Sequence, residues 1–268
     1  MNSFKDHTFV IVDVATTGFR PDVDSPVEIA AVKIKNGEVI DQKKWRLDPG
    51  VSIPPAASAH HEIRDSDVVG CPSLEDVESD INSFVGDATI VMHNLATGEA
   101  LDKAMLPFLH DRTWICSARL AKHMYPQLTQ NNGFPLANYD VWTLLYWMNE
   151  TNLNTFGAQV YEPLANAAAT AVVFNKTLET YLSKGEMPTI EGIVELTEKP
   201  VAFPLMPRGP YKNCYMGDLP EEYLKTLAAK SRHSTDKTDI DYHFTIETEV
   251  STRLQAKFGH TGGVRKFS

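Results

Sequence analysis

Short apolar runs rich in β-branched residues are separated by turn signals in the first part of the chain. Residues 8–14 (TFVIVDV) are such a run, and because they end at a Gly turn they predict a buried strand. Residues 26–35 alternate between apolar and polar positions, Asn36-Gly37 is a hairpin signal, and residues 38–47 follow as a third strand. The chain is therefore predicted to open with a three-stranded antiparallel meander.

Strands and helices alternate after this meander. Ser73 is a predicted helix N-cap, with Asp76 three positions later and apolar residues at helical spacing up to Val85. Residues 48–57 are rich in Pro and Gly and predict a loop. Further strands are predicted at 88–92 and 113–116, and further helices at 99–109, 117–124, 136–148 and 162–182. This order predicts an α/β fold with a mixed sheet and flanking helices.

Hydrophobic periodicity weakens beyond Gly185. Short helices are predicted at residues 189–197 and 220–229, and the polar tract 231–241 is predicted to lack regular structure. We therefore place the domain boundary near Gly185, with a main domain over residues 1–184 and a C-terminal accessory region over residues 185–268.

The composition is typical of a soluble globular protein. Of the 268 residues 43% are hydrophobic, and no apolar run approaches the roughly 18 residues of a membrane span. The N-terminal residues lack the apolar core of a signal peptide, and the three cysteines are widely spaced. These features favour a reducing, cytoplasmic location over a disulfide framework or a zinc site. The net charge of -10 argues against a broad basic surface for nucleic acid, although bound metal ions can supply positive charge locally.

Asp13 stands at the carboxyl end of the first predicted strand, where binding sites gather in α/β folds. Taken alone, an Asp in this position is more often a cap for the following turn. The segments FVIVDVATTGF and PVEIAAVKI, however, resemble the first motif of the DEDDh 3′–5′ exonucleases, the DnaQ-like family of the RNase H-like superfamily. The usual form of this motif is Asp-x-Glu-Thr-Thr-Gly. The resemblance implies that Asp13 is a metal ligand and that Ala15 replaces the catalytic Glu of the family.

The segment IVMHNLATGEALDKAML resembles the second motif of the family, and the WIC-x-x-x-LA run after it is similar to exodeoxyribonuclease X-type enzymes. The resemblance implies that Asp102 is a metal ligand, with Glu99 as a less favoured substitute, and that His93 and Asn94 contact nucleic acid. The spacer between Asn94 and Asp102 is longer than usual. From the residues alone, Asp102 is also explained as a solvated helical acid, and the His-Asn pair as polar groups at a strand end.

The segment VYEPLANAAATAVVF resembles the third motif, whose usual form is His-Arg-Ala-Leu-x-Asp. The resemblance places Tyr161 at the position of the catalytic base and Asn166 at the position of the last metal-binding Asp. Tyr161 is better explained as an aromatic residue that anchors the start of a helix. Asn166 still has a carbonyl oxygen that can ligate a metal, but it carries no charge.

Binding features are better preserved than catalytic ones. The resemblance implies that the turn at Thr16 and Thr17 presents backbone N–H groups to a terminal 3′ nucleotide. It also implies that His61 lines the same cleft, because residues 59–63 are similar to the Ala-x-His-x-Ile run of the family; from the residues alone, a His pair in a loop is more often solvated. Further along, a run resembles the one behind exodeoxyribonuclease X-type domains and contains a small basic and aromatic cluster that could contact a nucleic-acid backbone: Arg208, Tyr211 and Lys212. From the residues alone, such a cluster is more often an ordinary part of the surface.

Two-metal phosphodiester hydrolysis needs several carboxylates around two cations and a general base beside the attacking water. Only Asp13 and Asp102 remain of the four carboxylates in the family pattern. We therefore expect one weak Mg²⁺ or Mn²⁺ site at most, and impaired or lost hydrolysis of DNA or RNA 3′ ends. The alternative is a non-catalytic pseudo-nuclease that binds nucleic acid or a protein partner. The resemblance also allows a homodimer, and no association with a membrane is expected.

Overall fold

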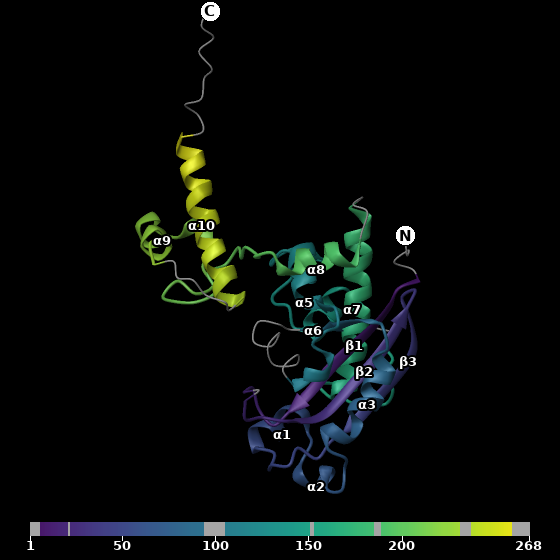
Figure 1. Cartoon of the computed structure of the whole chain (residues 1–268). Helices are drawn as coiled ribbons and strands as arrows, with labels where there is room; N and C mark the ends of the chain where they lie inside the picture. The colour runs from purple at the N-terminus through teal and green to yellow at the C-terminus, as the bar shows by residue number, and fades with distance from the viewer. Residues whose placement is uncertain are drawn as a thin grey trace, which may run out of the picture. The chain divides into compact units, whose positions relative to one another are not determined.

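The computed structural model describes residues 6–20, 22–93, 105–150, 153–184, 189–230 and 237–258. The chain forms two compact units, Met1–Tyr125 with Thr129–Glu198 and Pro126–Leu128 with Lys199–Ser268, and Figure 1 labels their helices and the first three strands. The sequence places the boundary near Gly185, before helix α8 (Ile190–Glu198), whereas the structure groups this helix with the first unit. The reason is that Ile193 is fully buried in the same apolar cluster as Phe174.

A five-stranded mixed sheet forms the centre of the first unit, in the order β3-β2-β1-β4-β5. Its strands are β1 (Thr8–Thr16), β2 (Pro26–Lys35), β3 (Glu38–Arg46), β4 (Thr89–Met92) and β5 (Trp114–Cys116). The first three form the predicted antiparallel meander, β4 pairs in parallel with β1, and β5 pairs in parallel with β4. The predicted α/β fold with a mixed sheet is confirmed.

Helices cover both faces of this sheet. Those described in the first unit are α1 (Pro55–His61), α2 (Asp65–Val68), α3 (Leu74–Val85), α5 (Ser117–Met124), α6 (Val141–Trp147), α7 (Pro163–Ser183) and α8, with a 3-10 turn at Pro107–Leu109 and a small hairpin of β6 (Gln130–Asn131) and β7 (Phe134–Pro135). α3 begins as predicted, because the Ser73 hydroxyl and the Asp76 carboxylate each accept a backbone N–H of the other residue. Most of the helix predicted at 99–109 lies outside the described residues. In the described ranges, no helix combines the length and apolar character that crossing a bilayer requires.

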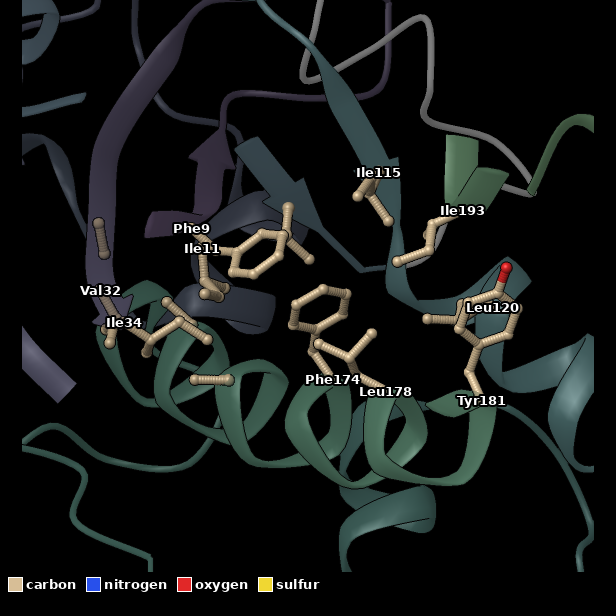
Figure 2. Close-up of a cluster of buried hydrophobic side chains, with 14 of the residues drawn as sticks. Phe9, Ile11, Val32, Ile34, Ile115, Leu120, Phe174, Leu178, Tyr181 and Ile193 are labelled. Carbon is tan, nitrogen blue, oxygen red and sulfur yellow. The ribbon is translucent and has the colours of Figure 1, made fainter. Parts of the chain in front are cut away.

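Side chains alternate between the two faces along β1, and each face has its own apolar cluster. Phe9 and Ile11 pack against α7, where Phe174 is the central ring, as Figure 2 shows. Val10 faces the other way and packs in a second cluster with Ile81 of α3. The sheet is therefore held between α7 and α3, and the continuation of the Phe9–Ile11 series places Asp13 on the α7 face.

Replacing Phe174 with Leu is expected to lower the free energy of unfolding by about 1 to 2 kcal/mol. Phe174 is fully buried, and its ring meets the ring of Phe9 edge to face with the centroids 5.0 Å apart. Leu loses this aromatic pair and leaves part of the space empty. Urea denaturation measures the change. The matched substitution Phe134→Leu, at a ring that is 72% exposed, should change stability by less than about 0.5 kcal/mol, and an equal loss at both positions would contradict the packing argument.

Two helices differ from the sequence prediction. α1 forms where residues 48–57 predict a loop, because Pro55 in its first turn already has the backbone angle that a helix start needs. The helix predicted at 136–148 is shorter in the structure, since the Asp140 side chain accepts the N–H groups of Trp142 and Thr143 and so begins α6 at Val141. Both differences matter for function, because α1 and α6 supply walls of the cavity described below.

The second unit is built around α10 (Lys237–Phe258), which packs on α9 (Glu221–Ala228) and on a 3-10 turn at Met216–Asp218. Tyr242 and Ile246 of α10 are buried against Leu224 of α9. The prediction of irregular structure over 231–241 is wrong for residues 237–241, which are helical, while residues 231–236 lie outside the described ranges. The helical spacing of Tyr242, Ile246 and Val250 was the signal that could have found α10.

The basic cluster predicted in this unit is partly neutralised. Arg208 makes an ion pair with Asp239 at 2.7 Å, and its guanidinium lies 3.9 Å from the ring centroid of Tyr242. Tyr211 packs against Tyr223, with ring centroids 4.7 Å apart. Arg208 and Tyr211 therefore have structural contacts inside the unit, which weakens the case for a dedicated nucleic-acid surface here.

Candidate functional site

A cavity of about 390 Å³ opens in the first unit at the carboxyl end of β1. Its walls come from β1, from the turn that follows it, and from helices α1, α6 and α7. The lining residues used below are Asp13, Ala15, Thr16, Thr17, Phe19, His60, His61, His93, Asp140, Trp142, Tyr161 and Asn166. The structure thus brings together eight of the ten residues that the three family motifs and the 59–63 run favoured as site positions. The other two, Asn94 and Asp102, lie outside the described residues, as does Glu99.

Asp13 is the carboxylate at the centre of the cavity wall. Its Oδ2 accepts a hydrogen bond of 3.3 Å from the side-chain amide of Asn166 on α7. Burial raises the pKa of Asp13 to about 7; the hydrogen bond from Asn166 offsets part of this rise, and the negative charge of Glu28 adds to it. Asp13 is therefore a carboxyl group that exchanges its proton near neutral pH.

Asn166 is held in one orientation by Trp142. The indole Nε1–H of Trp142 donates to Asn166 Oδ1 at 2.9 Å, and because an indole nitrogen can only donate, the carbonyl oxygen must face Trp142. The amide NH₂ group consequently faces Asp13 and the backbone oxygen of Tyr161, at 3.4 Å. The expectation that Asn166 offers its carbonyl oxygen to a metal does not agree with this arrangement, since a cation beside Asp13 would meet N–H groups.

Ala15 lies on the same side of β1 as Asp13 and is packed with Val27 and Ile63. In the register of the sheet it lies directly opposite Glu28, a fully buried carboxylate on β2. Oε2 of Glu28 accepts from Arg46 Nε at 2.7 Å, while Oε1 has no hydrogen-bond partner among the described residues. Glu28 is not among the residues that line the cavity, so this buried pair does not replace the carboxylate missing at Ala15.

His61, which is buried, and His93, which is half-buried, both use their ring nitrogens within the protein. His61 Nδ1 accepts the N–H of Ile63, so Nε2–H donates to the Thr16 carbonyl at 3.2 Å. His93 contacts the Ser117 hydroxyl and the Tyr139 carbonyl, at 2.7 and 2.8 Å. Burial lowers the pKa of His61, and lowers that of His93 to about 4. Both side chains are therefore neutral at physiological pH and fix the cavity walls.

The turn after β1 is held by Asp24. Thr17 Oγ1 donates to Asp24 at 3.1 Å and accepts the N–H of Ser25, and the Thr17 N–H donates to the Ser25 carbonyl. A Cβ at Gly18 would lie 2.5 Å from the Asp24 carboxylate, so a larger residue at this position would displace the Asp24 side chain from these contacts. The N–H of Thr17, expected to face a terminal nucleotide, is thus used to build the turn.

The described residues do not form a metal site. In the ranges that the structure describes, no three His, Cys, Asp or Glu side chains are grouped so that they could hold an ion. Asp140, the other acid in the cavity wall, uses Oδ1 to cap α6. Asp13 is left with an amide N–H in place of a second anionic donor, so this donor set fits a divalent cation poorly.

Comparison with known proteins gives the family. Residues 10–141 match the RNase_T family, which is described as exonuclease. A solved structure of Exonuclease X in complex with 5′ overhanging duplex DNA is similar to this chain, with a TM-score of 0.55 and 24% sequence identity, covering 70% of this chain and 99% of that one. The chain carries a DnaQ-like exonuclease domain.

Other relatives of the exonuclease domain agree with this assignment. The PolC-type DNA polymerase III of Clostridium perfringens is 32% identical over 126 residues, which are 46% of this chain and 9% of that protein. Its Staphylococcus aureus counterpart is 38% identical over 90 residues, 34% of this chain and 6% of that protein. The chain therefore spans less than a tenth of these relatives. Escherichia coli Exonuclease I in complex with a dT13 oligonucleotide has a TM-score of 0.52 and 17% identity, covering 67% of this chain and 43% of that one.

Two residues of the cavity were missed from the sequence. Trp142 was seen only as part of an apolar helix, although its indole N–H decides the orientation of Asn166. Phe19 was not singled out, although its ring is 75% exposed and lines the cavity. A buried Trp usually needs a partner for its N–H, and this was the one signal available for Trp142.

Proposed function

We propose that this exonuclease domain binds the 3′ end of a nucleic acid and that its phosphodiester hydrolysis is impaired or lost. The observation that carries this proposal is the hydrogen-bond chain from Trp142 through Asn166 to Asp13. It puts an N–H donor beside the carboxylate at the place where, by the family pattern, a second carboxylate would share a cation. Ala15 adds no oxygen donor for a metal ion. The described residues therefore do not supply the groups that a step of hydrolysis needs.

The cavity is better suited to binding a ligand than to hydrolysing a phosphodiester bond. It has the size and the partly apolar lining that are common in ligand sites, with a few polar groups at its base. The solved neighbours carry DNA, as a 5′ overhanging duplex in one and as a dT13 oligonucleotide in the other. We accordingly propose DNA or RNA 3′ ends as partners, and Mg²⁺ or Mn²⁺ as a weak ligand at one site at most.

Two assays on the wild-type chain test this proposal. An oligonucleotide labelled at its 5′ end is expected to bind in EDTA and to bind equally well when Mn²⁺ is added, with no shortening from the 3′ end. A circular oligonucleotide of the same composition, which has no end, is the control and is expected to bind more weakly. Progressive 3′ shortening in Mn²⁺ would contradict the proposal that catalysis is lost. Equal binding of the circular oligonucleotide would contradict the proposal that the protein recognises a 3′ end. If neither oligonucleotide binds, the result favours the alternative that the chain binds a protein partner instead of nucleic acid.

A further inference from the structure

Tyr161 has a backbone conformation that tyrosine rarely adopts. Its φ is +74°, in the turn closed by the hydrogen bond from Glu162 N–H to the Gln159 carbonyl just before α7. Gly or Asn is favoured at such a position, because a bulky side chain with positive φ crowds its own backbone. Strained residues of this kind persist where the surrounding structure requires them, and they concentrate at ligand sites.

The ring of Tyr161 lies outside the apolar core. It is 53% exposed, and it belongs to none of the apolar clusters of the described residues, whereas Leu164 on α7 does. The explanation of Tyr161 as an aromatic anchor for the start of this helix therefore does not agree with the structure. In the described part of the chain its hydroxyl has no hydrogen-bond partner, and the polar contact at this residue is made by its backbone oxygen, which accepts from the Asn166 amide at 3.4 Å.

The ring lies instead at the wall of the cavity, among other aromatic rings. Its centroid is 6.3 Å from that of Trp142, at an interplanar angle of 70°, and 6.5 Å from the ring of His60. Phe19, whose side chain is also largely exposed, lines the same cavity. Exposed rings held at one cavity are suited to stacking on a flat ligand.

The acidic residues of the cavity wall favour contact with the base of a nucleotide over contact with its phosphate. Among the described lining residues there is no Lys or Arg, and Asp13 and Asp140 are acidic. A phosphate group gains little from such a wall, whereas stacking on an aromatic ring needs neither a fixed positive charge nor a metal ion. The exposed ring is therefore a better contact for the base of a nucleotide than for its phosphate.

We propose that Tyr161 is a specificity-determining residue that stacks on the terminal nucleobase of a bound 3′ end. This proposal rests on the function proposed above. It gives a role in recognition to the residue at the position of the family's catalytic base. The strained turn at Tyr161 is then explained, because it holds the ring at the cavity.

The test compares two oligonucleotides that differ only at the 3′ end, one with its terminal base and one with an abasic terminal residue. In EDTA the wild type is expected to bind the intact probe about 5- to 150-fold more tightly, the range of one base stacked on an aromatic side chain. Tyr161→Phe is expected to keep this preference. Tyr161→Gly is expected to lose it while the Tm stays the same or rises by about 2 to 4 °C, because Gly relieves the strained backbone.

Two further variants keep the test decisive. Asn149→Gly relieves another positive φ, +61°, at a residue outside the cavity lining, and it should leave the preference for the terminal base unchanged. Tyr161→Asn tolerates positive φ without a ring and replaces the Gly variant if that protein does not fold. A wild type that binds both probes equally, or a Gly or Asn variant that keeps the preference, overturns the stacking role and leaves end binding intact. If the wild-type protein binds neither probe, the result contradicts the proposed function itself, the binding of 3′ ends.

Discussion

Replacing Ala15 with Glu, Asn166 with Asp and Tyr161 with His in one protein is expected to raise Mn²⁺-dependent removal of 3′-terminal nucleotides by at least about 10⁴-fold. The substitutions add two carboxylates beside Asp13 and a general base at the position that the family pattern gives it. Ala15 already lines the cavity, so a Glu side chain has a path toward Asp13. His accepts the positive φ of residue 161 more readily than Tyr does.

The geometry around Trp142 favours this outcome. Its indole N–H would donate to one oxygen of an Asp at 166, as it now does to Asn166 Oδ1, and the other oxygen would face Asp13. Without a cation, two carboxylates at this distance repel each other. The Asn166→Asp variant should therefore melt at a lower temperature than wild type in EDTA and recover on addition of Mn²⁺. This readout is independent of cutting.

A matched double variant separates the effect of the added charge from the effect of the changed side-chain shape. Ala15→Gln with Tyr161→His, leaving Asn166 unchanged, has nearly the same volume and the same base but no new carboxylate, and it is expected to stay inactive. Gel electrophoresis of a 5′-labelled oligonucleotide measures both proteins. A carboxylate-bearing variant that is folded, is stabilised by Mn²⁺ and still does not cut would show that loss of catalysis has causes outside these three positions. Residues that act as one unit are not additive, so single restorations should recover much less.

Replacing Asp13 with Asn is expected to stabilise the protein by about 2 to 4 kcal/mol above pH 7 and to have little effect near pH 4. The pKa of Asp13 is raised from 3.8 to about 7 in the folded state, chiefly by burial. The folded protein therefore binds this proton more tightly than the unfolded chain, and wild-type stability falls as the pH rises from about 4 to about 7. Asn has no proton to lose, and its carbonyl oxygen can still accept from Asn166.

Urea denaturation of wild type and variant at a series of pH values measures this difference. Asp140→Asn is the matched control, because Asp140 lines the same cavity and Asn is as good a helix N-cap. Its effect should stay below about 0.5 kcal/mol at every pH. A stability gain for the Asp13 variant that does not depend on pH would contradict the raised pKa and point to packing instead.

Local patterns predicted the framework of the site. The alternation in β1 and β2 and the Asn36-Gly37 turn produced the correct meander, and with it the side of the sheet on which Asp13 lies. The Ser73–Asp76 pair marked the start of α3 for the same reason, since a cap is formed by neighbours in the chain. α10 was missed although its apolar spacing is helical, because a polar tract precedes it.

The motif positions were also accessible from the sequence, but their contacts were not. Asp13 and Asn166 were placed in one site by resemblance, and the structure adds that an N–H group of Asn166 faces Asp13. Tyr161 was explained as an anchor, whereas its ring is exposed at the cavity. Neither the direction of an amide nor the exposure of a ring is encoded in local periodicity.

By itself, the sequence determined the strands and most of the helix starts, and it predicted by resemblance the family positions, with Ala15 in place of a carboxylate. Only the tertiary structure decided the state of the groups at those positions: the raised pKa of Asp13, the orientation of Asn166 and the place of the Tyr161 ring. The physical reason is that strand alternation and helix caps depend on neighbours in the chain. A pKa or an amide orientation depends instead on burial and on partners that folding brings together, as it does Trp142, Asn166 and Asp13.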